Sequence, residues 1–314
     1  MDWLLAGIGD IATRRVLPAI LAEPRCRLAG LVTRDAAKAE SYGVPSWRDM
    51  ETALAECAAE AVYLATPVFL HAPQTLAALS AGRHVLCEKP MALRYGEASA
   101  MQQASEKTGR VLGIAYYRRM YPKVVRAREL IAAGAIGRPV FAEATCHDWF
   151  YPADGFRGWL TDPAKAGGGP LHDIGCHRID LMNYLFGRPV RAIGQLSTLV
   201  QPIAVEDNAS VLIEYESGVR ALVDVRWHSR VARDEFRIRG TEGEIELTPL
   251  NSPRLAYPGG EEQLPPHANL HYPCIEDFTS AVLEGRAPRS SGATALATDW
   301  VIERARQSAE ISGC

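Results

Sequence analysis

Apolar positions in the first third of the chain form short, nearly continuous runs separated by helical patterns. Continuous apolarity rich in Val, Ile and Leu is typical of strands buried on both faces of a parallel sheet. The apolar runs cover residues 2–8, 26–33, 60–66, 83–89 and 110–116. The helical patterns cover residues 10–23, 35–43, 47–56, 71–82 and 97–109. This alternation predicts an α/β fold with a doubly wound parallel sheet. Pro18, inside the first helical pattern, should kink or shorten that helix.

The pattern changes after about residue 120. A helix over 123–134 is followed by alternating runs that predict a large, mostly antiparallel open sheet, and two helical patterns close the chain at 272–285 and 293–311. Ser217 and Gly218 mark a hairpin. We therefore expect a domain over 1–118 and an α+β domain over 119–314, whose last helix packs back on the first domain. The sheet runs cover residues 139–150, 190–200, 209–218, 219–229 and 235–249.

Composition and charge exclude several classes of protein. The chain has 314 residues, a net charge of −3 with both signs interspersed, and no apolar run near the ~20 residues of a membrane span. Nucleic acid and membranes are therefore not expected as partners. No signal peptide is visible, and the seven scattered cysteines show no C-x-x-C spacing. We interpret them as reduced thiols in a cytoplasmic protein, and we expect no metal site.

A glycine motif follows the first predicted strand. Gly7, Gly9 and Ala12 form G-x-G-x-x-A, with Asp10 and Ile11 between them. At the first strand–helix junction this pattern indicates a Rossmann dinucleotide site, where the helix N-terminus receives the pyrophosphate.

The residues at the end of the second predicted strand indicate whether the ribose of the dinucleotide carries a 2′-hydroxyl or a 2′-phosphate. Enzymes that use NAD usually place an acid there for the 2′-hydroxyl. This chain instead has Thr33 and Arg34, and Asp35 follows one or two positions after the place of the usual acid. An arginine suits a 2′-phosphate, so the pattern favours NADP over NAD. The alternative is that Arg34 is a solvated surface residue and Asp35 a helix N-cap.

Residues 167–169 are three glycines that run into His172, Asp173, His177 and Asp180. The glycines offer freedom to bring a helix start close to a cofactor. On a helix, Asp173, His177 and Asp180 share one face. His172 is expected as a capping or surface histidine, Asp180 as a structural acceptor or a substrate ligand, and Cys176 as a small buried thiol rather than a nucleophile.

Several segments together resemble the glucose–fructose oxidoreductase and inositol dehydrogenase (Gfo/Idh/MocA) family. They include "AGIGDIA", "HVLCEKPMAL", "LIAAGAIGRPV" and "AGGGPLHDIGCHRIDL". The resemblance implies a Rossmann domain, a second domain whose open sheet often forms dimers, and nicotinamide-dependent redox chemistry on a sugar, cyclic polyol or related carbonyl compound. A homodimer or a dimer of dimers is expected, also because the strands of 190–248 carry apolar residues on both faces.

The resemblance also assigns roles to individual residues. It makes Lys89, Asp173 and His177 catalytic, with the Lys89–Pro90 bond often cis in relatives. It places Thr66, Pro67, His71 and Glu88, with Lys89, at the cofactor. Two departures stand out: Leu160 occupies a position where relatives often have Arg, and Tyr116 and Tyr117 stand where they often have Asn.

The residue types fit proton-coupled hydride transfer. His177 can deliver or remove the proton, and Asp173 can orient this histidine or relay the proton. Lys89 can stabilise an oxyanion. Tyr116, Trp149 and Arg157 are candidate substrate ligands, with Arg157 as a replacement for the arginine missing at 160. The aromatic segment 144–159 suits a sugar site, and it suits an interface or a half-buried loop equally well.

Three functional hypotheses stay open. The first is an oxidoreductase acting on a sugar-like substrate. The second is a glycoside hydrolase that retains its cofactor, as some relatives do. The third is a non-catalytic regulatory protein that binds NAD(P), against which the complete set of Lys89, Asp173 and His177 argues.

Overall fold

The computed structural model describes residues 1–150 and 157–312, and its contacts divide the chain into two units. Unit 1 comprises Met1–Tyr117 and His267–Leu296. Unit 2 comprises Arg118–Pro266 and the chain from Ala297 onward. Among the described helices, none combines the length and the apolarity that crossing a membrane would take.

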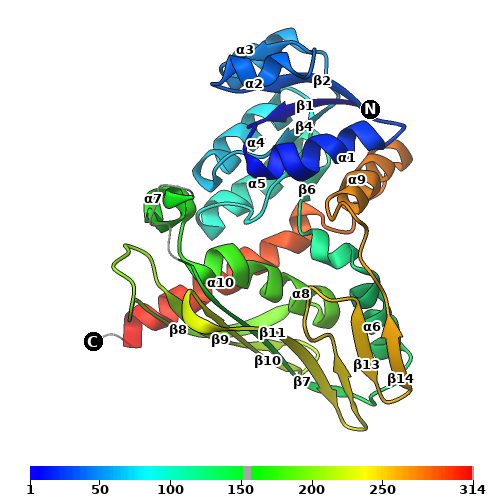
Figure 1. Ribbon diagram of the computed structural model, residues 1–314, viewed down its shortest axis with the longest axis vertical. Helices are drawn as coiled ribbons and strands as arrows, with labels where there is room; N and C mark the ends of the chain where they lie inside the picture. The colour runs from blue at the N-terminus through cyan, green and yellow to red at the C-terminus, as the bar shows by residue number, and fades with distance from the viewer. Residues whose placement is uncertain (151–156, 313–314) are drawn as a thin grey trace. The chain divides into compact units, whose positions relative to one another are not determined.

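Unit 1 contains the predicted doubly wound sheet (Figure 1). Its strand order is β3-β2-β1-β4-β5-β6, and every neighbouring pair is parallel. This is the order of a dinucleotide-binding Rossmann fold. The two-residue edge strand β3 was not predicted, because two residues carry no periodicity. The strands are β1 (Asp2–Ala6), β2 (Arg27–Val32), β3 (Ser46–Trp47), β4 (Ala61–Leu64), β5 (His84–Cys87) and β6 (Leu112–Ile114).

The helices of unit 1 lie close to their predicted positions. The first differs: a π-helical segment, η1 (Ala12–Val16), precedes α1 (Leu17–Ala22), and Pro18 stands in the first turn of α1. Proline is tolerated there because its missing N–H would have no partner within the helix. The others are α2 (Ala36–Glu40), α3 (Met50–Glu56), the 3₁₀ turn η2 (Val68–Leu70), α4 (His71–Ser80) and α5 (Tyr95–Thr108).

The helix α9 (Tyr272–Glu284) belongs to unit 1 although it lies far along the sequence. The Phe278 ring lies 5.5 Å from that of Trp3, and Thr279 is hydrogen-bonded to Cys26 at 3.2 Å. We had expected residues 119–314 to form one domain from which only the last helix returned. The structure differs because α9 completes the core beneath β1.

Unit 2 is an eight-stranded sheet in the order β14-β13-β12-β11-β7-β10-β9-β8. Only β7 and β10 pair in parallel, so the sheet is mostly antiparallel as predicted. Gly218, at φ 84°, closes the expected hairpin. The strands are β7 (Pro139–Trp149), β8 (Pro189–Ser197), β9 (Asn208–Tyr215), β10 (Arg220–Arg226), β11 (His228–Gly240), β12 (Glu244–Glu246), β13 (Arg254–Tyr257) and β14 (Gly260–Gln263).

Helices cover one face of this sheet (Figure 1). A side chain at Gly194 of β8 would lie 2.7 Å from Ala305, so the last helix packs directly on the strand backbone. The helical segments are the 3₁₀ turns η3 (Tyr117–Met120) and η4 (Gly158–Thr161), the π segment η5 (Leu171–Gly175), and α6 (Pro122–Ala132), α7 (Pro163–Ala166), α8 (Cys176–Phe186) and α10 (Gly292–Ser312).

The opposite face is more polar than the sequence suggested. Ile193 and Leu212 are exposed on it by 43% and 47%. Charged side chains fill much of the rest: Arg239 pairs with Glu143 at 2.7 Å and with Glu244 at 2.8 Å. Alternation in a strand assigns positions to a face, but it does not show that charged neighbours on adjacent strands will pair.

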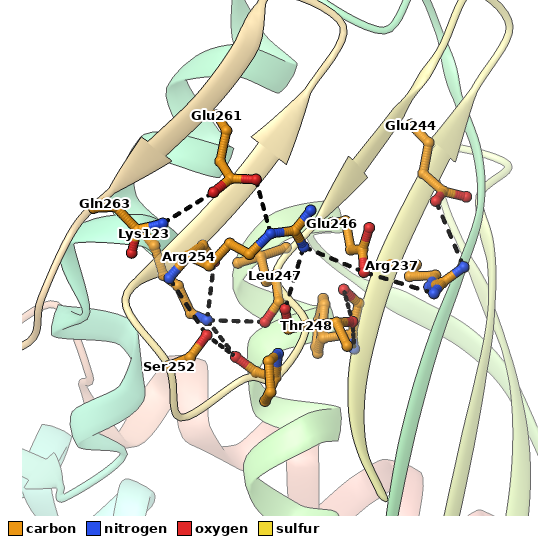
Figure 2. Close-up of polar contacts among 12 residues, drawn as sticks. Lys123, Arg237, Glu244, Glu246, Leu247, Thr248, Ser252, Arg254, Glu261 and Gln263 are labelled. Atoms are coloured by element: carbon orange, nitrogen blue, oxygen red, sulfur yellow. Dashed lines mark hydrogen bonds and ion pairs between the residues drawn. The ribbon is translucent and has the colours of Figure 1, made fainter.

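A buried lysine joins α6 to the strands at the edge of the sheet (Figure 2). Lys123 is 1% exposed, and its Nζ donates to the carbonyl oxygens of Leu247 at 2.8 Å, Pro249 at 2.7 Å and Arg254 at 3.3 Å. Burial lowers the pKa of Lys123 to about 8. One ammonium group therefore satisfies two backbone acceptors of the β12–β13 connection and one at the start of β13.

Replacing this lysine should cost stability. Lys123→Met retains an unbranched apolar stem but leaves the three carbonyl groups without their donor. We expect the free energy of unfolding to fall by about 1–3 kcal/mol. Urea titration measures this, with Lys107→Met, at an exposed position of α5, as the matched control. Equal midpoints for the two variants would contradict the assignment.

Candidate active site

The loop after β1 has the geometry that a dinucleotide needs. Gly7 has φ 91°, and a side chain there would lie 2.7 Å from the Ala65 carbonyl oxygen. A side chain at Gly9 would meet nothing within 4 Å, so the backbone is open to an approaching ligand. Ala12 is fully buried at the start of the π segment η1. The loop fits the pyrophosphate of a dinucleotide, with Asp10 and Ile11 beside it.

The end of β2 presents Arg34 to solvent. The Arg34 side chain is exposed, and it forms no hydrogen bond or ion pair with the rest of the described chain. Asp35 is occupied: its carboxylate accepts from the Lys38 backbone N–H at 3.3 Å and so caps α2. The structure thus shows both parts of the alternative: Arg34 is an exposed surface residue and Asp35 is the helix N-cap. Thr33 Oγ1 accepts from the Asp35 N–H at 3.1 Å.

His71 connects two of the predicted cofactor segments. It is 1% exposed, with Nε2 lying 2.9 Å from the Thr66 carbonyl oxygen and Nδ1 lying 2.9 Å from the Pro90 carbonyl oxygen. Burial lowers the pKa of His71, while the two carbonyl contacts oppose that change. Thr66, followed by Pro67, also adjoins the Gly7 turn. His71 thus holds the backbone on either side of the predicted nicotinamide position.

Glu88 is used inside unit 1. Its Oε1 accepts from Tyr63 at 2.7 Å and lies 3.0 Å from His271 Nε2, and its Oε2 accepts from the Lys89 backbone N–H at 3.3 Å. Burial alone would raise the pKa of Glu88, but the bonds from His271 and Tyr63 hold that pKa below its usual value. The carboxylate positions the segment that carries Lys89. The Lys89–Pro90 bond is cis, as expected.

The two tyrosines after β6 differ. Tyr116 is fully buried. Tyr117 lies with its ring 4.7 Å from that of His271, and the Arg15 guanidinium is 6.0 Å from its centroid. The substrate contact predicted for Tyr116 stays a prediction.

The glycine run has a steric cause. A side chain at Gly169 would collide with the Glu206 carbonyl oxygen, and one at Gly168 would collide with the Arg306 guanidinium. We had attributed the run to conformational freedom near a cofactor. The structure instead shows close packing, and only Gly167, at φ 79°, also uses a left-handed backbone.

The helix that follows begins with a π turn. Asp173 lies in η5, and His177 lies in the first turn of α8, where it is 4% exposed. Short π segments occur often at functional sites, and both π segments among the described residues lie at predicted sites, η1 at the cofactor loop and η5 here. Cys176 is fully buried, as interpreted from its neighbours, and its Sγ lies 3.4 Å from the Asp173 carbonyl oxygen.

Two neighbours of this pair are structural. Asp180 is 1% exposed and accepts from Arg119 Nε at 2.8 Å; burial raises the pKa of Asp180, and the guanidinium opposes that rise. Of the two roles left open for Asp180, the structure shows the structural acceptor. His172 is not a surface histidine: it is 3% exposed, and its Nδ1 lies 3.2 Å from Arg306. The packing of α10 covers it.

The candidate substrate ligands of unit 2 are spread along the sheet and loop. Arg157 Nη2 donates to Asp173 Oδ2 at 3.2 Å. Trp149 is 38% exposed and stacks under Arg230, whose guanidinium carbon lies 4.0 Å from the ring centroid. Leu160 is buried in an apolar cluster with Trp227. Residues 151–156 of the aromatic segment lie outside the described residues.

A loop that sequence reasoning missed supports the helix start. Asp207 is buried, and its carboxylate accepts the backbone N–H groups of Leu199, Val200 and Gln201 at 2.9, 2.7 and 2.9 Å. Burial would raise the pKa of Asp207, but these N–H donors lower it to about 2. The loop carries Glu206, whose Oε1 accepts from the Leu171 N–H at 3.3 Å. An acid before a strand gives no signal of such a role.

Within each unit the structure brings predicted residues together. In unit 1 the Gly7 turn adjoins Thr66, and His71 bridges Thr66 to the residue after Lys89. In unit 2 Arg157 contacts Asp173. Lys89 belongs to unit 1, and Asp173 and His177 belong to unit 2.

Family models match both halves of the chain. Residues 1–116 match the model described as "Oxidoreductase family, NAD-binding Rossmann fold". Residues 124–246 match the "GFO/IDH/MocA C-terminal domain". The chain belongs to the Gfo/Idh/MocA family of oxidoreductases.

Similar proteins agree with this membership over nearly the whole chain. The 1,5-anhydro-D-fructose reductase of Ensifer adhaerens is 33% identical over 98% of each chain. The D-xylose 1-dehydrogenase (NADP(+)) 2 of Haloferax volcanii is 31% identical over 78% of this chain and 75% of its own. The crystal structure of aldose-aldose oxidoreductase from Caulobacter crescentus, complexed with glycerol, superposes with a TM-score of 0.89 at 29% identity, covering 99% of this chain and 98% of that one. Membership of the Gfo/Idh/MocA family makes the chain an oxidoreductase with an NAD-binding Rossmann domain.

The exposed Arg34 generates a prediction about the cofactor. NADP should bind more tightly than NAD, and Arg34→Ala should weaken NADP binding by about 1.5–3 kcal/mol while affecting NAD much less, because a charge-assisted phosphate contact is lost. Calorimetric titration measures both. Arg27→Ala, which removes an exposed arginine from the opposite end of β2, is the control. Equal or tighter NAD binding by the parent would refute the preference.

Proposed function

We propose that this oxidoreductase transfers a hydride between NADP and a hydroxyl or carbonyl carbon of a sugar, cyclic polyol or related compound. The observation that carries the proposal is the helix start of unit 2. There a π turn leads into α8 and carries Asp173 and His177 on a backbone fixed by close packing. The family resemblance assigns these two residues, with Lys89, to catalysis.

Each of the three side chains has a distinct task in the proposed reaction. The nicotinamide, when bound, supplies or accepts the hydride. Lys89 donates to the substrate oxygen and stabilises the negative charge that develops on it. His177 gives a proton to that oxygen in reduction and takes it in oxidation. Asp173 orients His177 and favours its charged form.

Cofactor preference rests on the second strand. The unpaired, exposed Arg34 and the occupied Asp35 support NADP, because the usual acid acceptor for the 2′-hydroxyl is missing. One relative carries NADP(+) in its name. The cofactor-binding set that we propose is Gly7, Gly9, Asp10, Ile11, Ala12, Thr33, Arg34, Thr66, Pro67, His71, Glu88 and Lys89.

The substrate class rests on the relatives and on side-chain chemistry. The relatives named above act, by their names, on an anhydro-sugar, a pentose and aldoses. Tyr116 and Trp149 are the proposed substrate ligands beside the catalytic set, since aromatic faces with polar partners suit sugars. The cysteines are scattered along the chain, and the six that the structure describes form no disulfide, which supports a cytoplasmic location.

A substrate panel tests the function directly. Sugars, inositols and keto-sugars are incubated with each nicotinamide cofactor, and absorbance is followed at 340 nm. Net conversion of NADP or NADPH with one of these compounds supports the proposal. Glycoside cleavage without net cofactor conversion would identify the cofactor-retaining hydrolase instead, and binding without any turnover would identify a regulatory protein.

Substitution of the catalytic set should separate binding from chemistry. Lys89→Ala should leave cofactor affinity largely intact and lower kcat by about 10²–10³, because an oxyanion stabiliser acts mainly in the transition state. His177→Ala should lower kcat by about 10²–10⁴ and also remove one limb of the pH–rate profile. Lys89→Ala should keep that limb. Steady-state kinetics from pH 5 to 10 measure these effects.

The double variant and a control complete this test. The losses from Lys89→Ala and His177→Ala should not add if the residues act as one unit. Lys107→Ala, at an exposed position of α5, should behave like the parent. Near-parent turnover by His177→Ala would show that the proton is carried by another group, with Lys89, Tyr116, Tyr117 and His147 the next residues to substitute.

The assembly proposed is a two-fold homodimer, or a dimer of dimers, formed through the outward face of the unit 2 sheet. Exposed Ile193 and Leu212 lie on this face among paired charges. Light scattering at micromolar concentration should give twice the mass of the chain or more, and Leu212→Glu should shift the protein toward monomer. A parent that is monomeric at that concentration would contradict this assembly.

A further inference from the structure

Arg157 adopts an unusual backbone conformation. Among the described residues it is the one non-glycine residue with a positive φ, at φ 60° and ψ 19°. A Cβ in this left-handed region crowds the following carbonyl, so the conformation persists only where surrounding contacts enforce it. Strained residues of this kind concentrate at active sites, which directs attention to what the side chain contacts.

The Arg157 side chain is held between an aromatic ring and a carboxylate. Its guanidinium carbon lies 5.4 Å from the centroid of the Phe150 ring, within the range of a cation–π contact. Phe150 in turn packs on buried Trp227, with ring centroids 4.7 Å apart. On the other side Nη2 donates to Asp173 Oδ2 at 3.2 Å.

Asp173 is the more enclosed partner of the pair. Its side chain is 12% exposed, compared with 42% for Arg157. The guanidinium therefore covers a carboxylate at the start of the helix that carries His177. With this donor already directed at Asp173, the geometry does not require a substrate to account for Arg157.

We propose that Arg157 is a positioning residue that acts through Asp173, rather than a ligand of the substrate. This proposal rests on the proposed function, in which Asp173 orients His177. The guanidinium fixes the carboxylate oxygen that it contacts and keeps Asp173 ionised. It also adds positive charge to the surroundings of His177.

An Arg157 variant keeps all the other ionisable residues on the elements around Asp173. The underlying strand β10 contributes apolar Val225. Ionisable side chains on these elements include His172 of η5, His177 of α8, Arg306 of α10, which contacts His172, and Glu206 of the loop before β9, which accepts from the Leu171 N–H. A shift of the pH–rate profile on replacing Arg157 alone therefore reports the loss of its own charge.

Two substitutions separate backbone from charge. Arg157→Gly removes the guanidinium and accepts the left-handed backbone without strain. Arg157→Lys keeps a positive charge and the same left-handed backbone as the parent, but it lacks the planar pair of N–H donors. We expect Arg157→Gly to lower kcat by about tenfold to a hundredfold, because the carboxylate loses its fixed orientation. Its pH–rate limbs should move to higher pH by about 1 unit, because removing a cation raises the pKa of nearby groups. Arg157→Lys should show a smaller shift.

Combining Arg157→Gly with Asp173→Asn tests whether Arg157 acts through Asp173. If Arg157 acts through Asp173, Arg157→Gly should add little further loss in an Asp173→Asn background. Thermal unfolding of each variant shows how far folding is affected. A lower Tm with the parent pH profile and kcat would overturn the proposal and leave Arg157 a structural residue.

Further outcomes are equally decisive. A raised KM with unchanged kcat and pH profile in Arg157→Gly would overturn the proposal and make Arg157 a substrate ligand. Full loss of turnover in Asp173→Asn with parent kinetics in Arg157→Gly would overturn the positioning role alone. Parent turnover in Asp173→Asn would instead reject the proposed function itself, and the positioning role with it.

Discussion

The start of the helix that carries Asp173 and His177 depends on the close approach of two backbones. Gly169 lies so near the Glu206 backbone carbonyl that no side chain fits, whereas the neighbour of Gly168 is the mobile end of the Arg306 side chain. Because protein interiors are densely packed, such contacts fix a backbone more firmly than a flexible segment could. The segment that looks most mobile in the sequence is therefore one of the most constrained in unit 2.

This constraint continues through neighbouring elements to Arg157. Asp207 holds its loop with three backbone N–H groups, and its own carbonyl accepts from the Trp227 N–H at 2.8 Å. Trp227 supports Phe150, and Phe150 supports the guanidinium that contacts Asp173. A buried carboxylate remote in sequence thus contributes to the surroundings of a proposed catalytic residue.

Local patterns in the sequence determined most of the fold that could be predicted. Five of the six strands of the first sheet and nearly all helices follow from continuous or periodic apolarity, which depends only on neighbours in the chain. The strands β3, β13 and β14 could not be predicted, because they are two to four residues long and β14 is mostly polar. Their formation depends on backbone pairing with an adjacent strand.

The same difference between local patterns and distant contacts decides which site residues could be predicted. The spacing of Gly7 and Gly9, and of Asp173 and His177, identified the candidate residues because motif geometry is local. The roles of Asp180 and His172 were not decidable, since their partners Arg119 and Arg306 lie 61 and 134 residues away. Packing between distant segments decides whether an ionisable group faces a ligand or another side chain.

The placement of α9 in unit 1 has a consequence for biosynthesis. Trp3 is made long before Phe278, although the rings of these two residues pack on each other. At a synthesis rate of about 5–20 residues per second, the first strand waits on the order of tens of seconds for this partner. The nascent chain must carry an incomplete apolar core until Phe278 has been made. The species most exposed to proteases and chaperones is therefore the unfinished chain on the ribosome.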